Sequence, residues 1–370
     1  MRGKAYHYGT VVGKTIGSGM NGKPKKGARE KDLTGRYLAG RLDEDRVQTH
    51  QRFSHREANF QKDRMLRTVS MRAEEAILSD VAKLPIGKVV QVFSLFCHVE
   101  YEGKRILCVV RKTLASARVS AMVVGDMVRF LHVAGEEAAV IEEILPRKTV
   151  LTRSQSHNVS DQQPVVANAE QMLIVVSIAQ PAVKWGLVDR MIISAQSGGL
   201  KPIVCLNKID LVETDPRAAQ IMDFAREALA HYATLGVVTL QTSAIRNVGL
   251  ERLREYLGGR TTVLAGHSGV GKSSLIGAVQ PGLNLRVGAN NAHTGKGRHT
   301  TTSANFYPLG FGGAVVDTPG IRQFGLWGVT RENLEQYFPD LQNNAGPPWR
   351  RESFQRIAAS LGQADKSYGP

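Results

Sequence analysis

The chain has 370 residues, enough for two or three domains, and 42% of them are hydrophobic, as in ordinary folded proteins. It carries 48 Lys and Arg against 33 Asp and Glu, a formal net charge of +15, which favours a polyanionic partner, either nucleic acid or an anionic membrane surface. The chain has no apolar stretch of about 18 residues and no signal-peptide core at its start, which argues against membrane-spanning and secreted classes. Its three cysteines lie outside any C-x-x-C pair. We therefore expect a cytoplasmic protein with reduced cysteines.

Residues 1–67 form a basic arm. They contain 16 Lys and Arg and 7 Asp and Glu, a net +9 out of the chain's +15. Apolar residues are sparse and unperiodic here, so the segment buries too little surface to offset the entropy of ordering, and we predict that it is mostly disordered. Such an arm is either a solubilising tail or a segment that orders on RNA.

Short apolar runs separated by turn residues follow over residues 85–150. They are Gly87–Phe93, Arg105–Val110, Gly125–Leu131 and Ala138–Ile144. Short strands at this spacing predict a small all-β barrel, and an OB fold is the natural candidate because its size fits. Such barrels often bind oligonucleotides. The polar residues 147–163 then indicate a linker.

From residue 165 to about 330, apolar strands alternate with helices. The predicted strands are Met172–Ile178, Pro202–Leu206, Val237–Gln241, Thr261–Ala265, Ala304–Tyr307 and Ala314–Val316. The predicted helices are Leu187–Ser197, Ala218–Tyr232, Leu250–Leu257 and Lys272–Val279. This alternation predicts an α/β domain with a mostly parallel sheet covered on both faces.

A phosphate-binding P-loop lies inside this domain. The string G-x-x-x-x-G-K-S/T follows a predicted strand and opens a predicted helix, which is the context that the motif requires. Its glycines let consecutive N–H groups face phosphate oxygens, and the helix N-terminus adds unpaired donors. The residues are Gly266, His267, Ser268, Gly269, Val270, Gly271, Lys272 and Ser273, followed by Ser274. Lys272 would contact the β- and γ-phosphates, and Ser273 would bind Mg²⁺.

Two further strand ends carry groups suited to a guanine base. Asn207, Lys208 and Asp210 form the string N-K-x-D after the second predicted strand. The Asp210 carboxylate can accept two hydrogen bonds from guanine, whereas adenine would leave it unpaired, so the string favours GTP over ATP. Ser243 and Ala244 follow the third strand, where a backbone N–H can meet the guanine carbonyl.

Two segments after the P-loop are expected to read the γ-phosphate. Asp317 and Gly320 bound the string D-T-P-G after the last strand; Asp317 would orient Mg²⁺ through water and the Gly320 N–H would meet the phosphate. One hydroxyl of Thr300–Thr302 would complete the Mg²⁺ coordination. We assign it to Thr301, although the sequence does not separate the three threonines.

Position 321 bears on hydrolysis. Many GTPases place a glutamine there to orient the attacking water, but this chain has Ile321. His299 is the best replacement, because imidazole can orient or polarise a water molecule. An exposed loop histidine without a role is the alternative.

The order of the motifs is unusual. Conventional GTPases run from the P-loop through the Thr switch and D-x-x-G to N-K-x-D, whereas here Asn207–Asp210 and Thr242–Ala244 precede the P-loop. This is a circular permutation in which every strand is kept and only the connections change. The D-x-x-G segment therefore runs directly into residues 322–370.

A barrel followed by these strings in permuted order resembles the RsgA/YjeQ family, the small-ribosomal-subunit-dependent GTPases of bacteria. The resemblance covers residues 85–340 and is carried by Gly266–Ser274, Gly295–Thr302 and Asp317–Gly320. It implies an OB fold before the GTPase domain and a cytoplasmic location. It also implies GTP and GDP as ligands, and a role in late assembly of the small subunit, which would stimulate slow hydrolysis. The switch histidine of the family corresponds to His299.

The C-terminal segment, residues 331–370, departs from that family. Its members usually carry a Cys/His zinc module there, but this chain has no cysteine after Cys205 and no histidine after His299, so we expect no zinc site. Helical patterns near Glu332–Tyr337 and Glu352–Leu361 predict a short helical tail instead.

The motifs therefore predict a GTPase that uses Mg²⁺, and the resemblance implies the small ribosomal subunit and its rRNA as partners. We expect no membrane partner and a monomer. Two alternatives stay open. The first is an RNA-binding protein that keeps guanine nucleotide without turnover, which Ile321 favours. The second is a P-loop phosphotransferase acting on a small molecule, against which Asp210 argues.

Overall fold

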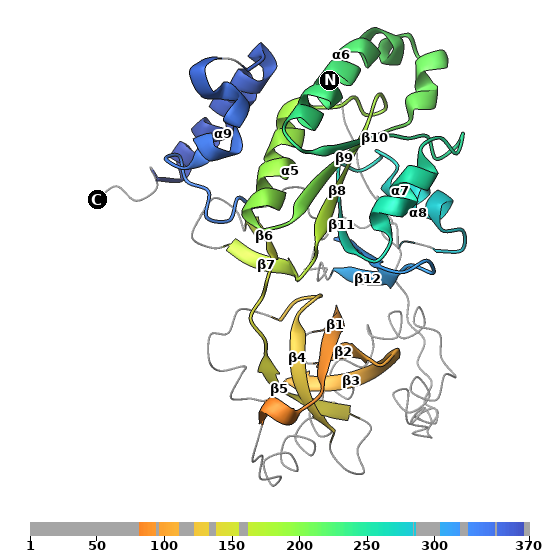
Figure 1. Ribbon diagram of the computed structural model, residues 1–370, viewed down its shortest axis with the longest axis vertical. Coiled ribbons are helices and arrows are strands. Elements are labelled where there is room, and N and C mark those ends of the chain that lie inside the picture. Colours follow the sequence, from red (N-terminus) through yellow and green to blue (C-terminus); the bar gives the residue numbers. More distant parts are fainter. Residues whose placement is uncertain are drawn as a thin grey trace, which may run out of the picture. The chain divides into compact units, whose positions relative to one another are not determined.

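The computed structural model describes residues 81–93, 96–110, 122–132, 138–154, 162–283, 285, 304–318, 325–344 and 346–365 (Figure 1). All described residues belong to the compact unit Met65–Pro370. The predicted basic arm, residues 1–67, lies outside the described residues. Within the described ranges, no helix combines the length and apolar character needed to cross a membrane.

A closed five-stranded barrel comes first in the described chain. After the 3₁₀ turn η1 (Val81–Lys83), its strands are β1 (Ile86–Val92), β2 (Phe96–Tyr101), β3 (Lys104–Val110), β4 (Met127–His132) and β5 (Ala138–Ile144). Their spatial order is β1-β2-β3-β5-β4, with β3 and β5 parallel and the other pairs antiparallel. This is the OB topology, so the predicted barrel is confirmed.

The barrel closes around alternating inward side chains. Val89, Cys97, Cys108, Val128 and Phe130 are among those that pack together with no exposed surface. Period-two alternation directs every second residue to this core. Both cysteines are free, as the composition predicts.

A hairpin occupies part of the predicted linker. Strands β6 (Val150–Ser154) and β7 (Gln162–Ala167) pair antiparallel, so the expectation of a linker over residues 147–163 is wrong for residues 150–154 and 162–163. Leu151 and Thr152 are buried, and the Val150 N–H donates to Gly198 O at 3.0 Å. Long-range pairing, rather than local pattern, makes this segment a strand.

The second domain is built on a six-stranded sheet ordered β10-β9-β8-β11-β13-β12. In chain order these are β8 (Gln171–Ser177), β9 (Lys201–Asn207), β10 (Val238–Gln241), β11 (Thr261–Ala265), β12 (Asn305–Pro308) and β13 (Ala314–Asp317). All neighbouring pairs are parallel except β12 with β13. The predicted mostly parallel sheet is therefore confirmed.

Helices cover both faces of this sheet (Figure 1). They are α5 (Trp185–Ser197), α6 (Pro216–Thr234), α7 (Leu250–Leu257) and α8 (Lys272–Val279), with the 3₁₀ turn η2 (Ile209–Glu213) after β9. Strand β8 is buried along its whole length. Met172 and Ile174 pack in one apolar cluster with residues of α5 and α6, whereas Leu173 and Val175 pack in another with residues of α7 and α8. A continuous apolar strand is what burial on both faces requires.

The C-terminal part is helical, as predicted. It comprises η3 (Leu334–Tyr337), η4 (Pro339–Asn344) and α9 (Pro348–Asp365). Leu326, Val329, Phe338 and Ile357 form an apolar cluster with Ile193 of α5. Pro348 starts α9, where its missing N–H and fixed φ are tolerated.

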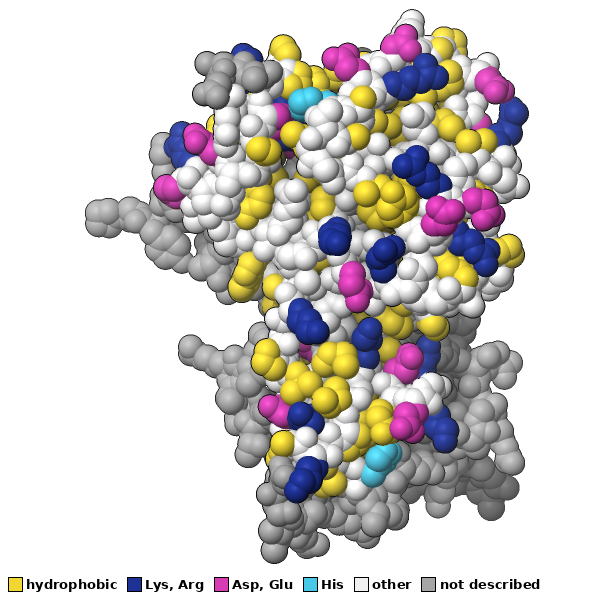
Figure 2. Space-filling view, in the orientation of Figure 1, with side chains coloured by type: hydrophobic (Ala, Val, Ile, Leu, Met, Phe, Trp, Pro, Cys, Tyr) yellow, Lys and Arg dark blue, Asp and Glu magenta, His cyan; other side chains and the backbone are white. Residues whose placement is uncertain are grey.

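Charges of both signs are interspersed on the face drawn in Figure 2 rather than gathered into one basic patch. The distribution of charge along the sequence is consistent with this surface, since residues 1–67 hold +9 of the net +15 and leave +6 for residues 68–370. The electrostatic attraction to a polyanion is therefore concentrated in the N-terminal arm.

We predict that Phe130→Ala lowers the free energy of unfolding of the barrel by about 3–5 kcal/mol, because it removes a fully buried ring and leaves a cavity. Urea denaturation followed by circular dichroism measures this. Phe93→Ala is the control, since that ring is 37% exposed and its loss should have a much smaller effect. Equal midpoints for both variants would contradict the assignment of the core.

Candidate nucleotide-binding site

Four strand ends bring the predicted site residues to one edge of the sheet. Asn207 ends β9, and Asp317 ends β13. Thr242 follows β10, and Gly266 follows β11. Because these strands are parallel, their carboxyl ends lie at the same edge, which is where ligands bind in open α/β sheets.

Two glycines give the P-loop its shape. Gly266 has φ 135° and Gly271 has φ 93°, values that side chains other than glycine rarely adopt. A Cβ on Gly266 would lie 2.2 Å from Val175 O, and one on Gly271 would lie 2.5 Å from Asn207 Nδ2. The loop therefore passes close to β8 and to the N-K-x-D segment, and no larger residue fits at either position.

The Lys272 ammonium group lies inside the loop. Its Nζ donates to Gly266 O at 2.7 Å and to His267 O at 3.0 Å. Burial lowers the pKa of Lys272, and the nearby Asp317 carboxylate opposes that shift. Burial likewise raises the pKa of Asp317, and Lys272 opposes it. The two charges thus share a partly dehydrated environment, in which a phosphate can compete for the ammonium hydrogens.

The remaining P-loop residues differ in exposure. His267, Ser268, Gly269 and Ser274 are exposed, whereas Val270 is buried against the apolar cluster that includes residues of α7 and α8. Ser273 is half-buried in the first turn of α8. Helix α8 begins at Lys272, so its unpaired N–H groups lie at the loop.

Asn207 joins the N-K-x-D segment to the P-loop. The side chain is buried, and its Nδ2 donates to Val270 O at 3.0 Å. Its Oδ1 accepts a hydrogen bond of 3.1 Å from Thr242 Oγ1. One amide side chain therefore connects three motif segments, each of which lies at the carboxyl end of a different strand.

The two other polar residues of this string lie nearby. Asp210 Oδ1 accepts a hydrogen bond from Ser243 Oγ, so the carboxylate and the Thr242–Ala244 turn are in direct contact. Lys208 has a left-handed backbone with φ 62°, and its Nζ donates to Gln180 O at 2.6 Å. Ala244 is half-buried beside Ser243.

The structure adds residues that the sequence patterns miss. Gln180 and Pro181 lie in the loop between β8 and α5, beside Lys208 and the P-loop. A Cβ on Gly269 would lie 3.6 Å from Pro181 Cδ. The position of this loop, directly after a central parallel strand, is the one signal that could have indicated it.

The predicted γ-phosphate segments are only partly described. His299, Thr300–Thr302, Gly320 and Ile321 lie outside the described residues. Ser273 and Asp317 are described. Among the described residues, no three His, Cys, Asp or Glu side chains are grouped so that they could hold a metal ion.

This geometry fits a nucleotide. The Lys272 ammonium donates to carbonyl oxygens that a phosphate can replace, and Asp210 contacts the turn after β10. The P-loop strand β11 is the fourth of the five parallel strands in chain order, and an OB barrel precedes them. The chain therefore has the architecture of a circularly permuted P-loop GTPase.

The comparison with family models agrees, because residues 144–327 match the RsgA GTPase model. A small ribosomal subunit biogenesis GTPase RsgA from Pseudomonas aeruginosa is 36% identical over 284 residues, covering 76% of this chain and 80% of the relative. The protein of the same name from Azotobacter vinelandii is 34% identical, covering 81% and 85%. The chain belongs to the RsgA GTPase family.

Solved structures show the same fold. YjeQ from Thermotoga maritima is 30% identical with a TM-score of 0.55, covering 76% of this chain and 96% of that one. YloQ, a circularly permuted GTPase, has a TM-score of 0.56 at 23% identity, covering 79% and 98%. The predicted family and fold class are therefore confirmed.

We predict that Gly271→Ala weakens GTP and GDP binding at least about tenfold, or about 1.4 kcal/mol, because its Cβ would overlap the Asn207 side chain. Fluorescent nucleotide titration measures the affinity. Gly236→Ala is a matched control: it also has positive φ, 77°, but a Cβ there meets nothing within 4 Å. Similar affinities for the two variants would show that the contact with Asn207 is unimportant.

Proposed function

We propose that this protein hydrolyses GTP to GDP and phosphate and acts in the biogenesis of the small ribosomal subunit. The observation that carries the proposal is the Asn207 side chain, which joins the N-K-x-D segment, the Thr242–Ala244 turn and the P-loop at one sheet edge. Membership of the RsgA family supports the biological role, since its relatives are named small ribosomal subunit biogenesis GTPases.

Asp210 reads the base in this proposal. A carboxylate in contact with Ser243 is placed to accept hydrogen bonds from the N1–H and the amino group of guanine. A backbone N–H near Ala244 meets the guanine carbonyl, and the Lys208 side chain lies beside the base. Adenine would leave the Asp210 carboxylate unpaired, which costs about 1–3 kcal/mol or more for a charged group.

The P-loop holds the phosphates. Backbone N–H groups of residues 266–274 and the Lys272 ammonium bind the β- and γ-phosphates, and the Gly320 N–H meets the γ-phosphate. Ser273, Thr301 and, through water, Asp317 would hold Mg²⁺. When bound, the ion would neutralise charge on the β- and γ-phosphates, as it does in P-loop enzymes generally.

His299 orients the attacking water in this proposal. Ile321 has no polar group that could do so, and an imidazole can hydrogen-bond a water molecule without taking up its proton fully. The alternative of a nucleotide-gated RNA-binding protein with little turnover would leave His299 without a catalytic effect.

The proposed partner is the small ribosomal subunit with its rRNA. Residues 1–67 carry most of the excess positive charge and supply phosphate contacts whose strength depends on salt. The protein acts in the cytoplasm, as a monomer and without zinc in its C-terminal segment, where no cysteine or histidine is available.

Asp210→Asn should lower GTP affinity at least about tenfold, or about 1.4 kcal/mol, and raise affinity for xanthosine triphosphate. An amide offers the donor that the extra xanthine oxygen needs, and it cannot accept both guanine hydrogen bonds. Competition titration with the two nucleotides measures the preference. Unchanged selectivity for GTP would remove Asp210 from the base site.

His299→Ala should keep GTP affinity within about threefold and lower hydrolysis stimulated by small subunits at least about tenfold, equivalent to about 1.4 kcal/mol in the barrier. Phosphate release under single-turnover conditions separates chemistry from nucleotide binding. His132→Ala is the control, because His132 is exposed at the end of barrel strand β4. If both variants hydrolyse GTP at the wild-type rate, His299 has no part in the reaction.

A further inference from the structure

One side of helix α5 contacts the C-terminal part of the chain. Ser194 Oγ donates to Gly325 O at 2.9 Å, and Ile193 packs in the apolar cluster with Leu326 and Ile357. Arg190 Nη1 donates to Ser360 Oγ at 3.1 Å. Positions 189, 190, 193 and 194 are i,i+4 neighbours on a helix, so the contacts lie along one side of α5.

The other end of α5 is connected to the candidate nucleotide site. The loop before the helix holds Gln180, whose carbonyl accepts the Lys208 ammonium at 2.6 Å, and Pro181, whose carbonyl accepts Ser177 Oγ at 2.6 Å. Helix α5 therefore touches the nucleotide-binding edge through its preceding loop and the C-terminal part through its side.

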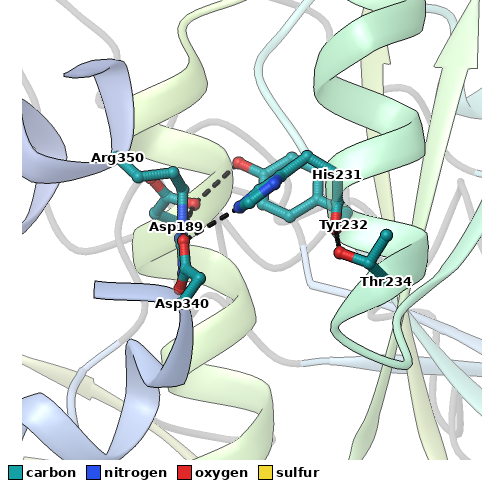
Figure 3. A network of polar contacts seen from close by, with 6 residues as sticks. All are labelled: Asp189, His231, Tyr232, Thr234, Asp340 and Arg350. Carbon is teal, nitrogen blue, oxygen red and sulfur yellow. Dashed lines mark hydrogen bonds and ion pairs between the residues drawn. The ribbon is translucent and has the colours of Figure 1, made fainter. Parts of the chain in front are cut away.

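Arg350, the third residue of α9, is the polar centre of this second contact (Figure 3). Its guanidinium donates Nε and Nη2 to the two Asp340 oxygens, both at 2.8 Å, and Nη1 bonds Asp189 Oδ1 on α5. Tyr232 OH on α6 also donates to Asp189 Oδ1, at 2.7 Å, and His231 Nε2 lies 2.9 Å from Asp340 Oδ2. The Arg350 guanidinium also lies 4.3 Å from the centre of the Phe338 ring.

The charged groups of this contact are buried, so the loss of one partner strongly destabilises the contact. The side chains of Asp189, Arg350 and Asp340 are 0%, 3% and 5% exposed. Taking one partner from a buried ion pair leaves the other charge without compensation, and this destabilises such sites by several times more than loss of a surface pair. A bidentate guanidinium pair also restricts orientation, so α9 and η4 are held on α5 in one geometry.

The chain connects this part to the γ-phosphate segment. Asp317 is fixed in the sheet by pairing of β13 with β11. Gly325 is fixed by Ser194 and by its N–H, which donates to Thr152 O at 2.9 Å. The residues that follow Asp317 in the proposed D-x-x-G motif must therefore reach an anchor on α5 within a short stretch of chain.

We propose that Arg350 is a positioning residue: by clamping residues 325–365 to α5, it makes the C-terminal part respond as one body to the nucleotide state of the GTPase site. The proposal rests on the proposed function. It assigns Arg350 no contact with nucleotide; its effect is exerted through Asp189 on α5 and Asp340 in η4.

The test compares Arg350→Met with Arg356→Met in the full-length protein. Arg356 is exposed on the same helix and pairs only with Glu352 among the ion pairs of the described residues, so it is matched in residue type and helix. Amide hydrogen exchange is measured over residues 326–338 and 348–361, with GDP and with a non-hydrolysable GTP analogue. GTP hydrolysis is measured with and without purified small subunits.

For the wild type and Arg356→Met, we expect exchange in both segments to change together between the two nucleotides. For Arg350→Met, the difference should vanish in residues 348–361, and stimulated hydrolysis should fall at least about tenfold while GTP affinity changes by less than about threefold. Arg350→Lys, which can bind one carboxylate but not both in bidentate fashion, should be intermediate.

The proposal is overturned if Arg350→Met keeps the nucleotide-dependent difference in residues 348–361, or if Arg356→Met loses it to the same extent. Should Arg350→Met fail to fold, Asp340→Asn provides the same comparison with the Arg350–Asp189 pair intact. If small subunits fail to stimulate even the wild type, the proposed function is wrong, whereas the exchange measurement still decides the clamp.

Discussion

The hydrogen bond from Asn207 Nδ2 to Val270 O holds the two halves of the site together. One half, on β9 and β10, carries the groups suited to a guanine base; the other, on β11 and β13, carries the phosphate loop and Asp317. The bond is buried, and an unsatisfied amide in its place would destabilise the structure by about 1–3 kcal/mol. Gly271 must be a glycine for the same reason, since a Cβ would meet that amide.

Circular permutation changes the connections between the strands and keeps their spatial order in the sheet. The parallel strands still present their carboxyl ends at one edge, so the site forms although β8, β9 and β10 precede the P-loop in the chain. The permutation has its consequence at the C-terminal end of the GTPase domain. The segment after Asp317 leads directly to Gly325, and from there into a helical part that is held on α5 by apolar packing and by Arg350. In this protein, Arg350 provides a polar anchor for the C-terminal part that needs no metal ion.

Much of the fold and most of the motif residues could be predicted from the sequence, because each strong pattern lies within a short stretch of chain. Helices α7 and α8 have the predicted bounds, Leu250–Leu257 and Lys272–Val279, since glycines flank α7 at both ends and a glycine directly precedes α8. Strand β6 could not be predicted, because it is short and partly polar and depends on pairing with residues 162–167. The partnership of Arg350 with Asp189 spans 161 positions, and nothing local distinguishes Arg350 from Arg351 or Arg356 on the same helix. The motif residues of the candidate site are visible in the sequence as contiguous strings, whereas Gln180 gains its significance only from Lys208, the neighbour that folding gives it.

GTP turnover by the purified full-length protein tests most directly whether the small ribosomal subunit activates this chain as a GTPase. Phosphate release is measured for the protein alone, with purified small subunits and with large subunits as the control. We expect slow turnover alone, a rise of at least about tenfold with small subunits and no comparable rise with large subunits. Tight guanine-nucleotide binding without turnover under saturating small subunits would contradict this expectation.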